Sequence, residues 1–181
     1  MKKVLIVNSS PRKNGVGNCS SFSTHLKEKL DNNNIPSTLI DLKDYNIEFC
    51  TGCFNCDETG KCVIDDDFTN IIAKEVVDSQ IIIWVSPNYC KLMSSRMKLF
   101  IERLCPLYSY LDENTKDYAI YVSGETSLDN IAMAAETISR FTEVDDIHMK
   151  KICDPILNLG DFDESKVDEM FNAIKKSIES D

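Results

Sequence analysis

Residues 80–86, QIIIWVS, give the clearest strand signal in the chain. Three isoleucines precede a tryptophan and a valine, so the centre of the run offers no polar face, and Pro87 follows directly. Such a run predicts a strand that is buried on both sides and ends at the proline. Four other segments continue this pattern, the last of them weakly: 2–8, 38–42, 118–123 and 144–152.

Amphipathic helical patterns alternate with these strand segments. Apolar residues recur three or four positions apart in each pattern, which is the spacing of one helix face. The aspartates at 65–67 are placed to cap the second of these helices. The expected core-facing residues are Phe22, Leu26, Leu30, Phe68, Ile71, Ile72, Val76, Met97, Phe100, Ile101, Leu104, Leu128, Ile131, Ala135, Ile138, Phe141, Val167, Met170, Ile174 and Ile178.

Buried strands that alternate with helices predict a parallel sheet covered on both faces. We therefore expect an α/β fold with a doubly wound, five-stranded parallel sheet, flavodoxin-like in its strand order 2-1-3-4-5. The 181 residues suit a single domain over 1–181, with a cysteine-rich loop at 50–62 inserted after the second strand. Ligands of this topology bind beyond the carboxyl ends of strands 1, 3 and 4, which directs attention to loops 8–21, 86–98 and 123–128.

Charge and composition exclude several classes of partner. The chain carries 30 acidic and 20 basic residues, a formal charge of −10, which argues against a nucleic-acid or anionic-membrane surface. The apolar start of the chain is interrupted too early for a secretory signal, and no run is long enough to cross a bilayer. We expect a cytoplasmic protein, in which eight cysteines favour metal or redox chemistry over structural disulfides.

The first loop, NSSPRKNGVGNCSS (8–21), has the composition of an anion site. It brings four serines, two glycines and the cations Arg12 and Lys13 to the start of a helix, where free N–H groups favour an anion. The spacing matches neither the Rossmann fingerprint nor a Walker loop, so a monophosphate is the expected anion. Ordinary turn chemistry remains the alternative. The loops that begin at Ser86 and Ser123 are polar but less specific.

Four of the eight cysteines lie within CTGCFNCDETGKC (50–62). Cys50, Cys53, Cys56 and Cys62 have the spacing Cys-x2-Cys-x2-Cys-x5-Cys, which is compact enough for the four corners of a [4Fe–4S] cluster. A zinc site, a reversible disulfide and a cysteine-rich turn without any metal stay open as alternatives.

The remaining cysteines and the two histidines carry weaker signals. Cys90, Cys105 and Cys153 each stand alone near apolar segments, so we expect small buried side chains. His25 and His148 lack a carboxylate or cysteine pattern around them, and no acid–base or triad chemistry is visible.

Three motifs, in this order, resemble the NADPH-dependent FMN reductase family and in particular its iron–sulfur flavoprotein branch. They are SSPRKNG, CTGCFNC…GKCVIDDDF and SPNY…MSSRMKLFIER. The resemblance implies FMN as cofactor, NAD(P)H as electron donor and a homodimer or homotetramer. No side chain is expected to be catalytic, because the flavin carries the chemistry.

The resemblance also implies which residues hold FMN. Ser10, Arg12, Asn14, Asn18 and Ser20 would hold the phosphate; Pro87, Asn88, Tyr89 and Met93 would border the ribityl chain and ring; Ser123 and Gly124 would flank the ring. The chain departs from the family pattern in several places, one of which is the loop before Asn18, lengthened here by Val16 and Gly17. Ser9 replaces a usual glycine, Cys19 replaces a usual phosphate-binding serine or threonine, and Asn88 stands at a usually apolar position.

The expected function is an FMN-dependent oxidoreductase. It would pass electrons from NAD(P)H or a reduced protein to a quinone, flavin, nitroaromatic, oxygen or a redox protein, with a [4Fe–4S] cluster feeding the flavin if the cysteines bind one. A flavodoxin-like electron carrier without its own substrate is the first alternative, and the acidic charge suits it. A non-catalytic metal-binding or redox-sensing module is the second.

Overall fold

The computed structural model describes residues 2–13, 16–107, 110–111, 117–124, 150–154 and 161–180. Parallel strands form its centre, and each of the predicted strands has a counterpart there. In spatial order they are β2 (Ser37–Asp41), β1 (Val4–Asn8), β3 (Ile81–Tyr89), β5 (Asp117–Ser123) and β6 (Lys150–Asp154). This is the doubly wound, flavodoxin-like order 2-1-3-4-5 that the sequence predicts.

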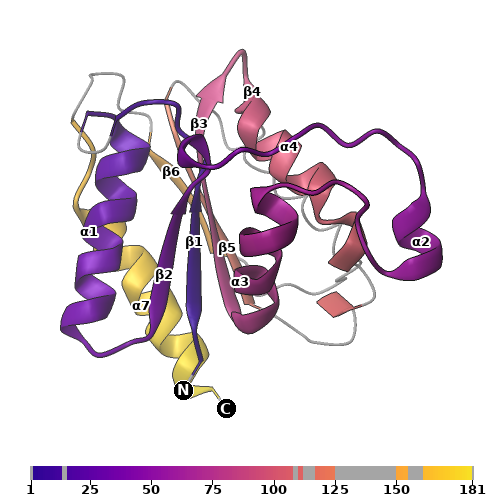
Figure 1. The fold of residues 1–181 in the computed structure, drawn as a ribbon. Coiled ribbons are helices and arrows are strands. Elements are labelled where there is room, and N and C mark those ends of the chain that lie inside the picture. The colour runs from indigo at the N-terminus through magenta and orange to yellow at the C-terminus, as the bar shows by residue number, and fades with distance from the viewer. Residues whose placement is uncertain are drawn as a thin grey trace.

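Helices cover both faces of the sheet (Figure 1). Successive strand residues point to opposite faces, so Val4 and Ile6 join one apolar core while Leu5 and Val7 join the other. The first core lies under α1 (Asn18–Asn32) and α7 (Ser165–Glu179). The second lies under the π-helical turn η2 (Phe68–Ile72), α3 (Ala73–Asp78) and α4 (Ser95–Arg103).

The prediction that β3 ends at Pro87 is wrong. The strand continues to Tyr89 and then turns back as β4 (Leu92–Met93), an antiparallel partner of its last residues. The pairing of β3 with β1 ends where Asn8 lies opposite Val85, and Pro87 pairs in register with Ser123 of β5. A proline, which lacks an N–H group, is tolerated where no ladder bond to β1 is required.

One predicted helix differs from expectation in its buried face, and another lies outside the described residues. Ile71 was expected to face the core but is exposed, because the π-helical turn places Phe68 and Ile72 on the buried side instead. The helix expected around Leu128 to Phe141, and the segment 144–149 expected to begin the last strand, lie outside the described residues.

The cysteine-rich segment leaves the sheet after β2. It follows the 3₁₀ turn η1 (Leu42–Asp44), carries the short helix α2 (Asn55–Thr59), and returns to η2. Figure 1 shows it running past the end of α4 to the side of the molecule away from α1. A second 3₁₀ turn, η3 (Cys105–Leu107), follows α4 on that side. Within the described residues, no helix is both long and apolar enough to traverse a bilayer.

Candidate functional site

The loop after β1 is fastened to β3 and to the start of α4 by serine hydroxyls. Ser9 donates from its backbone N–H and from its hydroxyl to the Val85 carbonyl, at 2.9 and 3.1 Å. Ser94 donates its own hydroxyl to the Ser9 hydroxyl at 2.8 Å and accepts the Met97 N–H at 3.2 Å as the cap of α4. Ser9 therefore has a structural use at the position where the family pattern has glycine. Sequence reasoning missed Ser94, because nothing local links it to Ser9.

Asn8 organises the polar side chains of the same loop. Its side-chain carbonyl accepts the Ser10 N–H at 3.0 Å, and its amide donates to Ser20 Oγ at 3.3 Å and to Asp41 at 2.5 Å. Ser10 and Ser20, both predicted phosphate residues, are thereby brought to the same end of α1 and are buried. The role of Asn8 could have been predicted from the sequence, because it is a polar residue at the end of a buried strand.

The start of α1 has the character of an anion site. Its cap residue, Gly17, provides no side-chain acceptor for the first-turn N–H groups. A Cβ on Gly17 would lie 2.9 Å from Arg12 Cδ, so the glycine lets the Arg12 side chain lie against the helix start. Asn18 is buried in the first turn, and Asn14 lies outside the described residues.

The β3–β4 hairpin forms the second side of the site. Its two turn residues, Cys90 and Lys91, adopt left-handed conformations with φ of 52° and 65°, which non-glycine residues rarely do. Cys90 is exposed in this turn, so the expectation of a buried Cys90 is wrong. Tyr89 is 41% exposed at the tip, while Met93, which pairs with Asn88, is half-buried.

The loop after β5 lies against the hairpin. Gly124 has a φ of 116° and donates its N–H to the Asp154 carbonyl at 3.1 Å. A Cβ on Gly124 would lie 3.4 Å from the Asn88 carbonyl oxygen. The structure therefore brings Pro87, Asn88, Ser123 and Gly124 together, as the sequence predicts for neighbouring parallel strands.

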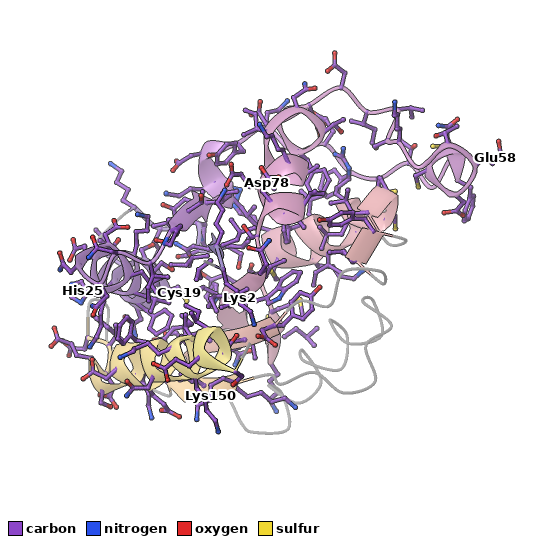
Figure 2. All side chains as sticks on the ribbon, turned by 90° about the horizontal axis from the view of Figure 1, so that it is seen from below. Lys2, Cys19, His25, Glu58, Asp78 and Lys150 are labelled. Carbon is purple, nitrogen blue, oxygen red and sulfur yellow. The ribbon has the colours of Figure 1, made fainter. Side chains whose placement is uncertain are left out.

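Cys19 is a buried residue in the first turn of α1, next to these loops. Burial raises the pKa of its thiol to about 12, although a hydrogen bond with the Ser123 backbone acts in the opposite direction. A neutral thiol is a weak donor, so Cys19 is poorly suited to hold a phosphate. Beside it, the ring of Phe22 stacks on Tyr121 with centroids 3.8 Å apart, and Tyr121 donates to Asp154 at 2.7 Å. In Figure 2 Cys19 lies inside the molecule, whereas His25 lies at its edge.

A model of the family described as NADPH-dependent FMN reductase matches residues 2–126. The chain belongs to this family. Its match spans the three loops described above and the cysteine-rich segment.

Curated relatives of the chain include iron–sulfur flavoproteins. One from Clostridioides difficile strain 630 is 33% identical over 103 residues, covering 55% of this chain and 44% of the relative. One from Archaeoglobus fulgidus is 34% identical over 106 residues, covering 59% and 46%. The chain thus matches slightly less than half the length of these relatives. The flavodoxin of Streptococcus pneumoniae TIGR4 shares the fold, with a TM-score of 0.56 and 18% identity over 96% of this chain and 95% of that one.

The three loops fit the cofactor that the family implies. A phosphate suits the uncapped start of α1 beside Ser10, Ser20 and Arg12, since helix N–H groups and a guanidinium both favour an anion. Gly124 leaves its side open where a flat ring would need close access to the backbone.

The four motif cysteines border one pocket. Cys50 and Cys53 are exposed in it, Cys56 and Cys62 are half-buried, and Cys105 of η3 lines it as well. Cys105 is therefore not the separate buried residue that the sequence predicts, while the Cys153 side chain lies outside the described part. Burial, then Asp57 and Cys105, raise the pKa of Cys56.

The donor set of the pocket fits a cluster in number and type. A [4Fe–4S] cube takes one thiolate at each of four irons, and the four motif thiols all border this pocket, with the Cys105 thiol as a fifth. Among the described residues, no three cysteine, histidine or acidic side chains are grouped closely enough to hold one metal ion together. Figure 2 places Glu58 of α2, in the cysteine-rich segment, far from Cys19 at the start of α1. The cysteine pocket and the predicted flavin site are therefore separate in space.

Proposed function

We propose that the chain is an FMN-dependent oxidoreductase. It passes electrons from NAD(P)H or a reduced protein to a small acceptor such as a quinone, flavin, nitroaromatic or oxygen. The observation that carries the proposal is the meeting of three polar loops at the carboxyl edge of the sheet, beside the uncapped start of α1. The family membership supports it independently.

The residues of the chain would divide the binding of FMN between them. Arg12, Ser10 and Ser20 would bind the phosphate, and Asn88, Tyr89 and Gly124 would border the ring. When bound, FMN supplies the hydride and electron chemistry. The protein's share is to hold the ring against the β3–β4 hairpin, whose exposed tip leaves room for a donor and an acceptor to approach.

The proposal extends to a [4Fe–4S] cluster held by Cys50, Cys53, Cys56 and Cys62. The proposal is supported by the pocket that all four cysteines border. It is also supported by the names of the iron–sulfur flavoproteins that the chain resembles. A homodimer or homotetramer belongs to the same proposal. Phe49, Phe54 and Val63 flank the cysteines with 59–75% of their surface exposed, which suits a surface covered by another subunit.

The first experiment is an absorbance spectrum of protein purified without oxygen, with FMN and iron counted per chain. Flavin bands over a broad brown shoulder, with about four irons per chain, support both cofactors. A flavin spectrum without iron leaves an FMN reductase whose cysteine segment is structural. Protein that neither contains nor binds FMN contradicts the proposal.

A flavodoxin-like electron carrier is the second candidate, favoured by the net charge of −10, which suits docking to a basic redox partner. Steady oxidation of NADH or NADPH with a quinone acceptor distinguishes the two. An FMN-loaded protein that turns over neither nicotinamide favours the carrier.

A further inference from the structure

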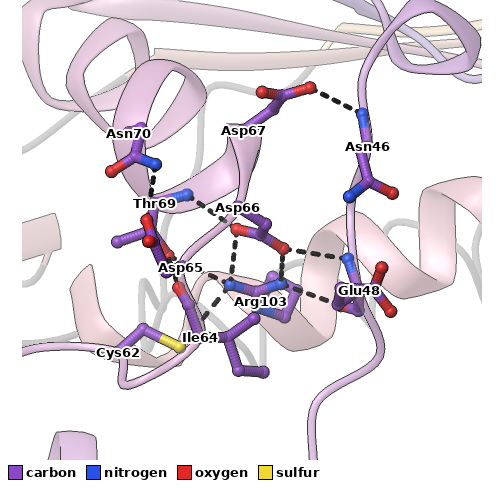
Figure 3. A network of polar contacts seen from close by, with 10 residues as sticks. All are labelled: Asn46, Glu48, Cys62, Ile64, Asp65, Asp66, Asp67, Thr69, Asn70 and Arg103. Carbon is purple, nitrogen blue, oxygen red and sulfur yellow. Dashed lines mark hydrogen bonds and ion pairs between the residues drawn. The ribbon is translucent and has the colours of Figure 1, made fainter.

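A buried arginine stands behind the cysteine pocket. Arg103, the last residue of α4, is 1% exposed, and its two terminal nitrogens donate to the two carboxylate oxygens of Asp66, whose side chain is fully buried. The guanidinium also donates to Thr69 Oγ1 at 3.1 Å and lies 5.0 Å from the centre of the Phe68 ring. Figure 3 shows this network between η2 and α4.

The same pair of side chains holds both ends of the cysteine-bearing segment. Before Cys50, Glu48 donates its N–H to Asp66 at 2.9 Å, and its carbonyl accepts from Arg103 at 2.8 Å. At the other end, the Arg103 NH2 group donates to Cys62 Sγ at 3.5 Å. The segment from Glu48 to Cys62 is thus closed onto one guanidinium–carboxylate pair (Figure 3).

Stability alone is a weak reason for such a pair. Desolvating two charges costs about as much as their attraction returns, and apolar residues of similar size often serve a fold equally well. Arg103 additionally lines the cysteine pocket, and its Nε has no hydrogen-bond partner among the described residues. A cation that touches a cysteine sulfur in the pocket bordered by all four motif cysteines suits an anionic cluster bound there.

We propose that Arg103 is a positioning residue of the cysteine site, which closes the 48–62 segment and donates a hydrogen bond to the Cys62 sulfur when that sulfur binds a [4Fe–4S] cluster. This inference rests on the cluster part of the proposed function. Arg103 reaches the cluster only through Cys62 and the segment ends. Hydrogen bonds to ligand sulfurs raise the reduction potential of a cluster, so Arg103 contributes to its potential as well as to its retention.

The test uses two variants and one control. Arg103→Lys keeps the positive charge but cannot make all of the guanidinium's hydrogen bonds at once. The double variant Asp66→Asn/Arg103→Gln removes both charges together, so that no buried charge is left unpaired. Arg96→Gln is the control, since Arg96 is an exposed arginine on the same helix. Each protein is reconstituted without oxygen using ferrous iron, sulfide and FMN.

Three quantities are measured: FMN per chain, the rate of iron loss to a chelator, and the cluster midpoint potential. We expect Arg103→Lys and the double variant to keep FMN, to lose iron at least tenfold faster than the parent, and to have lower midpoint potentials. Arg96→Gln should match the parent. FMN retention by Arg103→Lys shows that it is folded, so this variant decides the question even if the double variant does not fold.

Iron loss and potential that match the parent in Arg103→Lys overturn the role of Arg103 and leave the cluster proposal intact. A parent protein that takes up no iron, yet binds FMN, overturns both the cluster and the role of Arg103. The two failures are therefore distinguishable.

Discussion

The Ser94 hydroxyl donates to the Ser9 hydroxyl across 2.8 Å, although 85 residues separate them in the chain. The Ser9 hydroxyl in turn donates to the Val85 carbonyl, and the Ser94 hydroxyl accepts the Met97 N–H as the cap of α4. Two small hydroxyls thus join the loop after β1, the end of β3 and the start of α4. These hydrogen bonds fix the predicted phosphate loop to β3 and α4.

Replacing Ser94 by alanine removes the cap of α4 and the bond to Ser9. We expect the free energy of unfolding to fall by about 1 kcal/mol or somewhat more, the usual effect of losing a helix cap. Urea unfolding of the apoprotein measures this change. Ser95→Ala, an exposed neighbour in the same helix turn, should change it by less than about 0.5 kcal/mol. Equal effects of the two substitutions would contradict the role assigned to Ser94.

The phosphate assignment predicts a difference between FMN and riboflavin, which lacks the phosphate. Arg12→Ala/Ser10→Ala should release FMN on dialysis, because both residues lie beside the α1 start. Riboflavin affinity should be nearly unchanged. Fluorescence titration of each flavin gives both values, and Lys27→Ala, within α1 and away from its start, serves as the control for lost positive charge. Full retention of FMN, or an equal loss of both flavins, would show that the phosphate binds elsewhere.

Gly124 should tolerate no side chain, because its φ of 116° lies outside the left-handed region that asparagine also adopts. We expect Gly124→Asn to cost about 1–3 kcal/mol of stability and to weaken FMN binding. Gly60, with a φ of 68° and open space around it, is the matched comparison. Gly60→Asn should be nearly neutral in thermal unfolding. A stable Gly124→Asn protein with full FMN affinity would refute this requirement.

The buried thiol of Cys19 makes stability depend on alkaline pH. Its pKa is about 12 in the folded chain and about 9 when unfolded, so the unfolded state loses its proton first as the pH rises. This contribution is complete below pH 9 and declines between pH 9 and 12. Unfolding free energies at pH 8 and pH 10.5 should therefore differ less in Cys19→Ala than in the parent. Identical pH dependence in both proteins would contradict a buried, protonated Cys19.

The sheet could be predicted from the sequence because its strands are continuous apolar runs, such as 81–85, between amphipathic helices. The loops at its carboxyl edge followed from the topology, and the structure does bring Asn88 and Gly124 together there. The continuation of β3 through Pro87 could not be predicted, because it depends on where β1 stops pairing. Arg103 and Asp66 were also missed. They meet across 37 positions, and each alone is typical of an exposed helix residue or a helix cap.

Helix α4 begins at the Ser94–Ser9 contact and ends at the Arg103–Asp66 pair. At 1.5 Å per residue, its nine residues hold these contacts about 14 Å apart. A helix this short and this firmly held at both ends opens as a whole rather than fraying from one end. Its amide hydrogens should therefore exchange with solvent in a single cooperative event. Loosening the cysteine segment would accelerate exchange at the edge of the predicted flavin loops as well.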